Sequence, residues 1–348
     1  MKKIVFVSQR LYGGGAERVL VSLANYFSKK DFEVYIVSRY GETGCYPTEK
    51  DVNVEFLESQ SNLQFVKQLR SRIKSIRPTT VISFEYFYNL LSVIACLGVR
   101  VKLVISERND PAIVGAGLIK DTIRNFLYRF ADVLVCQTPD AADYFPQYIN
   151  RKTTIIANPL KDGLPLAYHG DRSKQIVTFC QLRKQKNIPL LLESFEIALK
   201  DIPDYQLVIY GSGDQEQIIM DKIQELHINN SVIMHPLCLD VHSKIIKASM
   251  YVSSSDYEGL SNSMLEAMAI GLPTICTDCP CGGARMVINN NINGVLVPVR
   301  DKFALAKAMV KVATDKDFSL HLSYEGSKLS DQLSMEVIGT QWIKLTEK

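Results

Sequence analysis

Two carboxylates stand eight positions apart in the last third of the sequence. Glu258 lies in a predicted loop, and a turn-prone stretch separates it from Glu266, which lies inside residues 262–270, a predicted helix. A pair of carboxylates can serve as general acid and general base, as it does in glycoside hydrolysis. Here one carboxylate belongs to a loop and the other to a helix, which argues against a simple acid–base pair.

Three consecutive glycines, Gly13, Gly14 and Gly15, follow the first apolar run and open a predicted helix. Glycines let the backbone approach an anion closely, and a helix N-terminus offers N–H groups at the positive end of its dipole. Arg18 stands where the third glycine of a dinucleotide-binding G-x-G-x-x-G would be, so that fingerprint is incomplete. The motif predicts a contact with an anion such as a phosphate, and a tight turn without a ligand is the alternative.

Cationic side chains follow two further predicted strands. Arg183 and Lys186 come after the run 176–179, and two cations there can stabilise negative charge on a ligand. A solvated cationic turn is the alternative. Arg108 follows another run, and as a cation that cannot accept a proton it can bind a phosphate or pair with Glu107.

Two weaker signals lie between the cations and the carboxylates. Gly213 ends a glycine turn between a predicted strand and a predicted helix, and His235 closes the next apolar run. Alone, Gly213 predicts only a turn, and a single histidine is more often structural than functional.

These residues must be positioned by the elements that precede them. Short runs rich in Val and Ile alternate with amphipathic helices from end to end, and runs that are apolar on both faces are typical of a parallel sheet covered on two sides. We expect strands at residues 4–8, 34–37, 52–56, 80–83, 102–105, 133–136, 153–156, 176–179, 206–210, 232–234, 250–253, 273–277 and 294–297.

A polar, turn-rich segment near residues 160–172 interrupts the alternation. The fold class is therefore α/β, with two doubly wound, Rossmann-like domains that face a central cleft. The predicted domains are residues 1–165, residues 166–325 and residues 326–348. The last of these is a helical tail with Trp342 that packs back on the first domain.

The bulk composition excludes several classes of protein. The 348 residues carry a formal net charge of +3, which gives no reason to expect nucleic acid as a partner. No apolar stretch is long enough to span a membrane, and the N-terminal run is too short for a signal peptide. The eight cysteines are scattered, and the close pair Cys279 and Cys281 has neither zinc-site nor redox spacing. We therefore expect free thiols and a cytoplasmic location.

Taken together, the motifs resemble those of the family 4 glycosyltransferases, which have the GT-B fold. The segment from Glu258 to Glu266 is similar to the family's E-x7-E segment, and Lys186 with Asn187 matches its diphosphate-binding motif. The chain departs from the family pattern where Cys180 and Gln181 replace a Gly-Arg pair, so Arg183 is a possible substitute for the family arginine. It departs again at Arg108, where many relatives have a histidine.

The resemblance implies a role for each position. Glu258, Lys186 and Arg108 would be catalytic, with Glu258 near the reacting carbon of the sugar, and Glu266 would hold the ribose hydroxyls of the donor. Backbone N–H groups at the start of the helix would bind the diphosphate or sugar hydroxyls. The remaining donor-binding positions would be Gly14, Gly15, Arg183, Gly213, His235, Gly259, Leu260 and Ser261.

The implied function is retaining transfer of a sugar from a nucleotide donor, expected to be UDP-linked, to a glycan or a polyprenyl-linked saccharide in surface polysaccharide synthesis. The resemblance implies that residues 1–165 form the acceptor side and that residues 166–325 bind the nucleotide sugar. Neither a cofactor nor a metal is expected, because the one D-x-D, at Asp315 and Asp317, lies in a helical segment away from the motifs. Two alternatives are a non-catalytic binder of sugar nucleotides or membrane-associated scaffold, and an NAD(P)-dependent oxidoreductase.

A basic amphipathic helix is predicted at residues 62–77. Its cations are Lys67, Arg70, Arg72, Lys74 and Arg77, without an acidic residue among them. A solvated crossover helix would have this character. The alternative is a helix that docks on anionic lipid headgroups, which would place the protein peripherally on the inner face of the cell membrane, or on the diphosphate of a lipid-linked acceptor.

Overall fold

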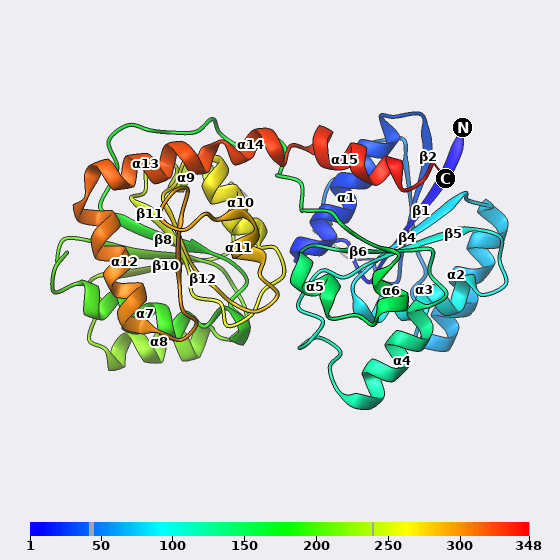
Figure 1. The fold of residues 1–348 in the computed structure, drawn as a ribbon, viewed down its shortest axis with the longest axis horizontal. Helices are drawn as coiled ribbons and strands as arrows, with labels where there is room; N and C mark the ends of the chain where they lie inside the picture. The colour runs from blue at the N-terminus through cyan, green and yellow to red at the C-terminus, as the bar shows by residue number, and fades with distance from the viewer. Residues whose placement is uncertain (42–44, 239, 348) are drawn as a thin grey trace. The chain divides into compact units, whose positions relative to one another are not determined.

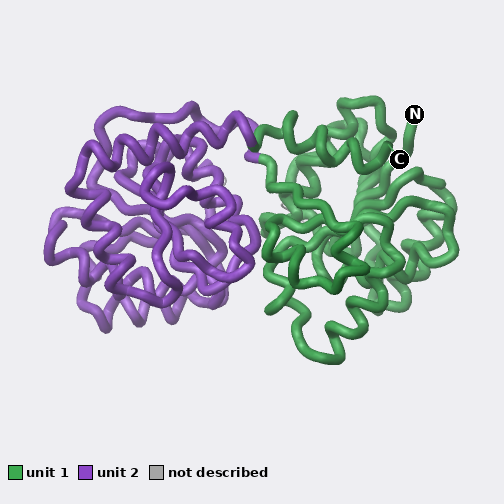
Figure 2. The backbone as a smooth tube through the Cα atoms, viewed as in Figure 1, with its two compact units in different colours: residues 1–159, 333–348 green, residues 160–332 purple. Residues whose placement is uncertain are grey.

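The structure is a computed structural model that describes residues 1–41, 45–238 and 240–347. It divides into two compact units (Figure 2): unit 1 is Met1–Pro159 with Leu333–Lys348, and unit 2 is Leu160–Gln332. The boundaries therefore lie six residues before and seven residues after the predicted ones. The tail predicted as one helical segment is divided between the units, because a short helix ends at Gln332 and a new one begins at Met335.

Unit 1 is built on a seven-stranded sheet in which every pairing is parallel. The strand order across it is β3 (Val52–Phe56), β2 (Phe32–Ser38), β1 (Lys2–Ser8), β4 (Thr80–Phe84), β5 (Lys102–Ser106), β6 (Val133–Cys136) and β7 (Thr153–Ile155). Figure 1 labels β1, β2, β4, β5 and β6 in this sheet. Strands β1 and β4 are almost completely buried, as their continuous apolar runs predict.

The helices of unit 1 are α1 (Gly15–Ser28), α2 (Asn62–Ile76), α3 (Tyr86–Cys96), α4 (Leu118–Tyr128), α5 (Pro139–Asp143), α6 (Gln147–Asn150) and α15 (Met335–Lys344). Helix α15 packs on α1. Gly339 permits the close approach, because a Cβ atom there would lie 2.4 Å from the Tyr26 ring. Trp342 is fully buried and its ring centroid lies 5.4 Å from that of Phe84, so the tail completes the core of unit 1.

Unit 2 repeats the design with six parallel strands. The strand order is β10 (Val232–His235), β9 (Gln206–Tyr210), β8 (Gln175–Phe179), β11 (Met250–Ser253), β12 (Thr274–Thr277) and β13 (Val295–Val297). The helical segments are the 3-10 turn η1 (Lys184–Lys186), α7 (Ile188–Ala198), α8 (Glu216–Glu225), α9 (Val241–Ile245), α10 (Asn262–Ala269), α11 (Gly283–Val287), α12 (Lys302–Thr314), α13 (Lys316–Ser327) and α14 (Leu329–Gln332).

Both units have the Rossmann strand order. In each unit the second and third strands extend the sheet on one side of the first strand, and the later strands extend it on the other side. In unit 2 the point where the strand order reverses, the switch point, lies between β8 and β11. The predicted fold class is confirmed, and each predicted strand occurs with ends that differ by at most two residues. Within the described residues, no helix is both long enough and apolar enough to cross a membrane.

Candidate active site

The loops that follow β8 and β11 are joined at the switch point of unit 2. The backbone N–H of Asp256 donates to the carbonyl of Gln185 over 2.9 Å. The Ser254 hydroxyl donates to the carbonyl oxygens of Lys186 and Asn187, at 2.9 and 3.0 Å. Asn187, in the left-handed region with φ 45°, caps α7 and donates to Asp256 over 2.9 Å. Two loops far apart in the sequence therefore form one rigid edge.

Lys186 and Glu258 meet at this edge. The Lys186 Nζ atom lies 2.8 and 2.7 Å from the two Glu258 carboxylate oxygens, and Gln185 Nε2 donates to the same carboxylate over 3.1 Å. Both side chains of the ion pair are mostly buried, with 15% and 18% exposed. Burial alone lowers the pKa of Lys186, but the attraction of Glu258 more than offsets it, so the pKa is raised. The Lys186 ammonium group is therefore fixed next to the Glu258 carboxylate.

Glu266 is buried on α10 and has a partner that the sequence did not predict. His242 Nε2, on α9, lies 2.8 Å from Glu266 Oε2, and both side chains are less than a tenth exposed. The edge of the His242 ring packs on Phe179, the last residue of β8, with ring centroids 5.5 Å apart. The imidazole therefore fixes the rotamer of the carboxylate. No short-range motif signals this pair, because the two residues lie on different helices.

The backbone that leads into α10 packs tightly against Gly283. Leu260 and Ser261 are buried, and Ser261 is the N-cap residue of α10. Gly283 lies against this segment so closely that a Cβ atom would be 1.8 Å from the Gly259 carbonyl oxygen. The first turn of a helix directs N–H groups that the helix itself does not use toward its N-terminus. Gly259, Leu260 and Ser261 are therefore placed next to Glu258 by tight packing.

The weaker predicted positions line the neighbouring strand ends. Gly213 follows β9, and a Cβ atom there would lie 2.3 Å from the Leu182 carbonyl oxygen, so packing of the two loops already requires glycine. The His235 ring stacks on Tyr210 with centroids 4.8 Å apart. Arg183 is exposed directly before η1. These contacts do not test the predicted donor-binding roles of Gly213, His235 and Arg183, which stay predictions.

In unit 1, the carboxylate of Glu17 lies against the glycine motif. Gly14 is the N-cap of α1, Gly15 is its first residue, and a Cβ atom on Gly14 would lie 1.8 Å from Glu17 Oε2. Glu17 is buried and lies 3.4 Å from Arg10 Nε. A Cβ atom at position 14 would therefore require the Glu17 carboxylate to move, and the predicted contact of Gly14 and Gly15 with a donor stays a prediction.

Arg108 does not pair with Glu107, so that sequence-based alternative was wrong. Its guanidinium donates instead to Asn158 and lies 4.5 Å from the centroid of the Phe84 ring. Burial lowers the pKa of Arg108 to about 9, with Glu85 offsetting part of the effect, so the group stays protonated at neutral pH. Arg108 is a fixed cation at the carboxyl end of β5.

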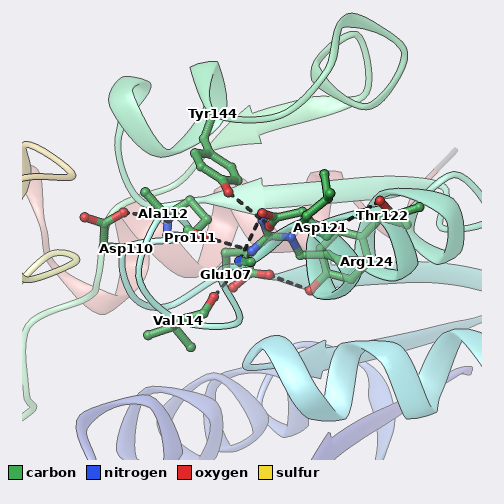
Figure 3. A network of polar contacts seen from close by, with 12 residues as sticks. Glu107, Asp110, Pro111, Ala112, Val114, Asp121, Thr122, Arg124 and Tyr144 are labelled. Carbon is green, nitrogen blue, oxygen red and sulfur yellow. Dashed lines mark hydrogen bonds and ion pairs between the residues drawn. The ribbon is translucent and has the colours of Figure 1, made fainter.

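Glu107 belongs to a separate buried network (Figure 3). It accepts a hydrogen bond from the Tyr128 hydroxyl, and burial raises the pKa of Glu107. Arg124 is fully buried, donates to the carbonyl oxygens of Pro111 and Val114 at 3.0 and 3.4 Å, and pairs with Asp121. This network clamps the loop between β5 and α4 against the inner face of α4.

The basic helix is present as α2, but its cations divide into two groups. Arg72 pairs with Glu55, and Arg70 donates to the carbonyl oxygens of Ala95 and Leu97 at 2.9 and 2.6 Å. Lys67, Lys74 and Arg77 are exposed. Two of the five cations therefore stabilise unit 1.

No metal-binding cluster of three or more His, Cys, Asp or Glu occurs in the part of the chain that the structure describes. The Asp315 of the D-x-D accepts a hydrogen bond from the Phe318 N–H over 2.9 Å and caps α13. Its carboxylate thus has a structural role. All eight cysteines are free thiols.

The predicted residues fall into two sets. Unit 2 brings together Lys186, Glu258 and the start of α10, with Glu266 on the same helix. Gly14, Gly15 and Arg108 belong to unit 1. Sequence reasoning missed His242, Gln185 and Asn158, which hold three of the predicted residues in place.

Comparison with known proteins decides the family. The model described as "Glycosyltransferase Family 4" matches residues 13–162, and "Glycosyl transferases group 1" matches residues 169–329. The chain belongs to the family 4 glycosyltransferases. The enzyme is 25% identical to an uncharacterized glycosyltransferase of Haemophilus influenzae, over 98% of this chain and 99% of that protein.

Two other similar proteins have more informative names. One is the Campylobacter jejuni enzyme named GalNAc-alpha-(1->4)-GalNAc-alpha-(1->3)-diNAcBac-PP-undecaprenol alpha-1,4-N-acetyl-D-galactosaminyltransferase, 26% identical over 99% of this chain and 98% of that protein. The other is the crystal structure of Anabaena HepE in complex with UDP and glucose, with a TM-score of 0.83, 16% identity and 99% coverage of both chains. The second likeness shows the GT-B fold.

Proposed function

We propose that this glycosyltransferase moves a sugar, with retention of anomeric configuration, from a UDP-sugar to a polyprenyl-diphosphate-linked saccharide. The acceptor is suggested by the lipid-linked substrate in the name of the Campylobacter relative, and the nucleotide by the UDP in the HepE complex. Such an acceptor places the reaction at the cytoplasmic face of the cell membrane, in the synthesis of a surface glycan.

The proposed binding of the nucleotide-sugar donor is supported by one observation. The ion pair of Lys186 and Glu258 lies at the switch point of unit 2, beside the N-terminus of α10. In open α/β sheets, ligands bind at the carboxyl ends of the strands at this point. We assign Lys186 and the α10 N–H groups to the diphosphate, Glu258 to the sugar, and Glu266 to the ribose hydroxyls. Lys186 and the helix dipole supply the positive charge that a metal would otherwise provide.

The proposed chemical step is a front-face substitution. The bond between the sugar C1 and the β-phosphate oxygen breaks, and the acceptor hydroxyl oxygen bonds to C1 from the same face. The proton of that hydroxyl passes to the leaving phosphate oxygen, so the step needs no protein base. Arg108, which cannot accept a proton, is assigned to an acceptor phosphate.

A thermal-shift screen with UDP-, GDP- and ADP-sugars, and with NAD as a control, tests the donor. A ligand at 100 times its Kd stabilises the protein by about 2.7 kcal/mol, and we expect this only for UDP-sugars. Stabilisation by NAD alone would exclude the proposal. Slow hydrolysis of the UDP-sugar without acceptor separates an active enzyme from a non-catalytic binder. Binding without hydrolysis would favour the alternative, a non-catalytic binder of sugar nucleotides. The replacement of the family's Gly-Arg pair by Cys180 and Gln181 would then explain the lack of activity.

A further inference from the structure

Helix α4 of unit 1 is folded with its apolar side outward. Its buried residues are Arg124 and Tyr128. Apolar side chains occupy the exposed face: Leu118 is 86% exposed, Ile119 75%, Ile123 48% and Phe126 54%, and Phe130 just beyond the helix is 48% exposed. An amphipathic helix at the surface of a soluble protein normally has the opposite arrangement. We call these five apolar residues the α4 stripe.

The buried network keeps the helix in this orientation. Arg124 bonds with Asp121 and with the Pro111 and Val114 carbonyls (Figure 3), and Tyr144 donates to Asp121 over 3.0 Å. Rotating α4 to bury its stripe would expose the apolar surroundings of Arg124 and break every one of these contacts. The exposure of the stripe is therefore imposed by the fold.

The charges beside the stripe are positive. Lys120 and Arg129 are exposed. The Arg129 guanidinium lies 5.7 Å from the centroids of the Phe126 and Tyr148 rings, so it stays at the edge of the apolar surface. Asp121, the acidic residue of α4, points into the network and is bound to Arg124. The surface thus combines apolar side chains, a tyrosine and two cations.

Other exposed apolar and cationic side chains lie on the helices next to α4 in unit 1. Helix α3 contacts both α4 and α2, so the three helices are neighbours in unit 1. Two apolar side chains at the end of α3, Ile94 and Leu97, are each 39% exposed. On α2, Lys67 and Lys74 are exposed.

We propose that the α4 stripe is a membrane-docking surface that inserts into the interface of a bilayer rich in anionic lipid. Helices that lie in a membrane interface have Leu, Ile and Phe on one side with Lys and Arg beside them, and bind by apolar burial together with attraction to anionic headgroups. The inference does not depend on which sugar nucleotide is used.

A second copy of the chain fits the stripe less well. In a two-fold dimer the same patch faces itself, so Lys120 and Arg129 would meet the cations of the other copy. An eleven-residue helix is also only about 16 Å long, which is short for a stable protein interface. An anionic bilayer matches both the charge and the apolar surface.

The first experiment is flotation of the full chain with vesicles of phosphatidylcholine, with and without phosphatidylglycerol. We expect flotation only with the anionic vesicles, and a loss of roughly tenfold or more in Ile123→Ser/Phe126→Ser. Lys120→Gln/Arg129→Gln should weaken partitioning by about five-fold for each cation removed. The matched control is Ile218→Ser/Met220→Ser, which removes two exposed apolar side chains from α8 of unit 2.

Insertion can be measured directly with Phe126→Trp, because the single native tryptophan, Trp342, is fully buried. Vesicles with brominated acyl chains should quench the new fluorescence. They should not quench Phe303→Trp, placed at a 68% exposed position of unit 2. Unchanged melting temperatures would show that the variants are folded.

Three outcomes would overturn the proposal. They are equal flotation of the serine variant and the parent, absence of quenching at position 126, and a parent dimer in sedimentation that the serine variant abolishes. Hydrolysis of the UDP-sugar without vesicles should be unchanged in Ile123→Ser/Phe126→Ser, so a failure here is distinguishable from a failure of the proposed reaction.

Discussion

The ammonium group of Lys186 lies within 2.8 Å of both carboxylate oxygens of Glu258, although 72 positions separate the two residues in the sequence. They meet because each follows a strand, and those strands, β8 and β11, are neighbours in the parallel sheet. The ion pair keeps Lys186 in one orientation before a substrate arrives. A positioned charge need not reorganise during the reaction, which is why such groups are effective in catalysis.

Replacing Lys186 should therefore reduce turnover more than binding. Lys186→Met removes the charge assigned to the leaving diphosphate, and we expect kcat to fall by about 10²–10³, the usual cost of losing one such group. Steady-state kinetics with a UDP-sugar measure it. Lys184→Met, at an exposed position in the same turn, is the matched control and should keep nearly full activity. A loss of less than threefold in Lys186→Met would contradict the assignment.

The same pair predicts a dependence of stability on alkaline pH. The folded protein raises the pKa of Lys186, so the pair stabilises the folded state fully below the pKa of an unfolded lysine, about 10.4. This contribution is lost as the pH rises through the higher pKa of the folded state. Urea unfolding of the parent and of Lys186→Met should show a stability difference that is constant near neutral pH and shrinks above about pH 10.4. If the difference in free energy of unfolding between the two proteins grew above that pH, the prediction would be wrong.

His242 should act as a positioning residue for Glu266. His242→Phe removes the partner 2.8 Å from the carboxylate, so we expect KM for the UDP-sugar to rise with a smaller change in kcat. Preference for the ribose donor over its 2′-deoxy analogue should also shrink, which a general loss of stability would not cause. His242→Gln, whose amide can still donate, should restore part of the preference. His321→Phe, at an exposed position of α13, is the control.

Removing Arg124 should destabilise unit 1. Arg124→Met removes the cation that pairs with Asp121, which keeps its hydrogen bond from Tyr144, and it leaves the carbonyl groups of Pro111 and Val114 without this donor. A buried polar group that loses its partner costs about 1–3 kcal/mol. Unfolding in urea measures this cost. Lys120→Met, at an exposed position on the same helix, should change the free energy of unfolding by no more than about 0.5 kcal/mol. A cost below 1 kcal/mol for Arg124→Met would mean that water replaces its contacts.

Much of the architecture was predictable from local patterns. Continuous Val and Ile runs such as β1 and β4 are buried on both sides only in a sheet that is covered on both faces. The strand positions and the fold class could therefore be predicted from the order of residues. Lys186, Glu258 and Glu266 could be singled out because motifs at strand ends and helix starts are themselves local.

The partners of these residues were decided by the tertiary structure. Glu107 and Arg108 are adjacent in sequence, yet one bonds to Tyr128 and the other to Asn158, because consecutive residues at a strand end point to opposite sides. His242 reaches Glu266 from another helix. Helix α4 shows the limit most clearly: its periodicity predicts an amphipathic helix, but which face is buried depended on Asp121, Tyr144 and the carbonyl groups that Arg124 meets in the folded chain. Sequence spacing determines that two faces differ, and only packing determines which of them meets solvent.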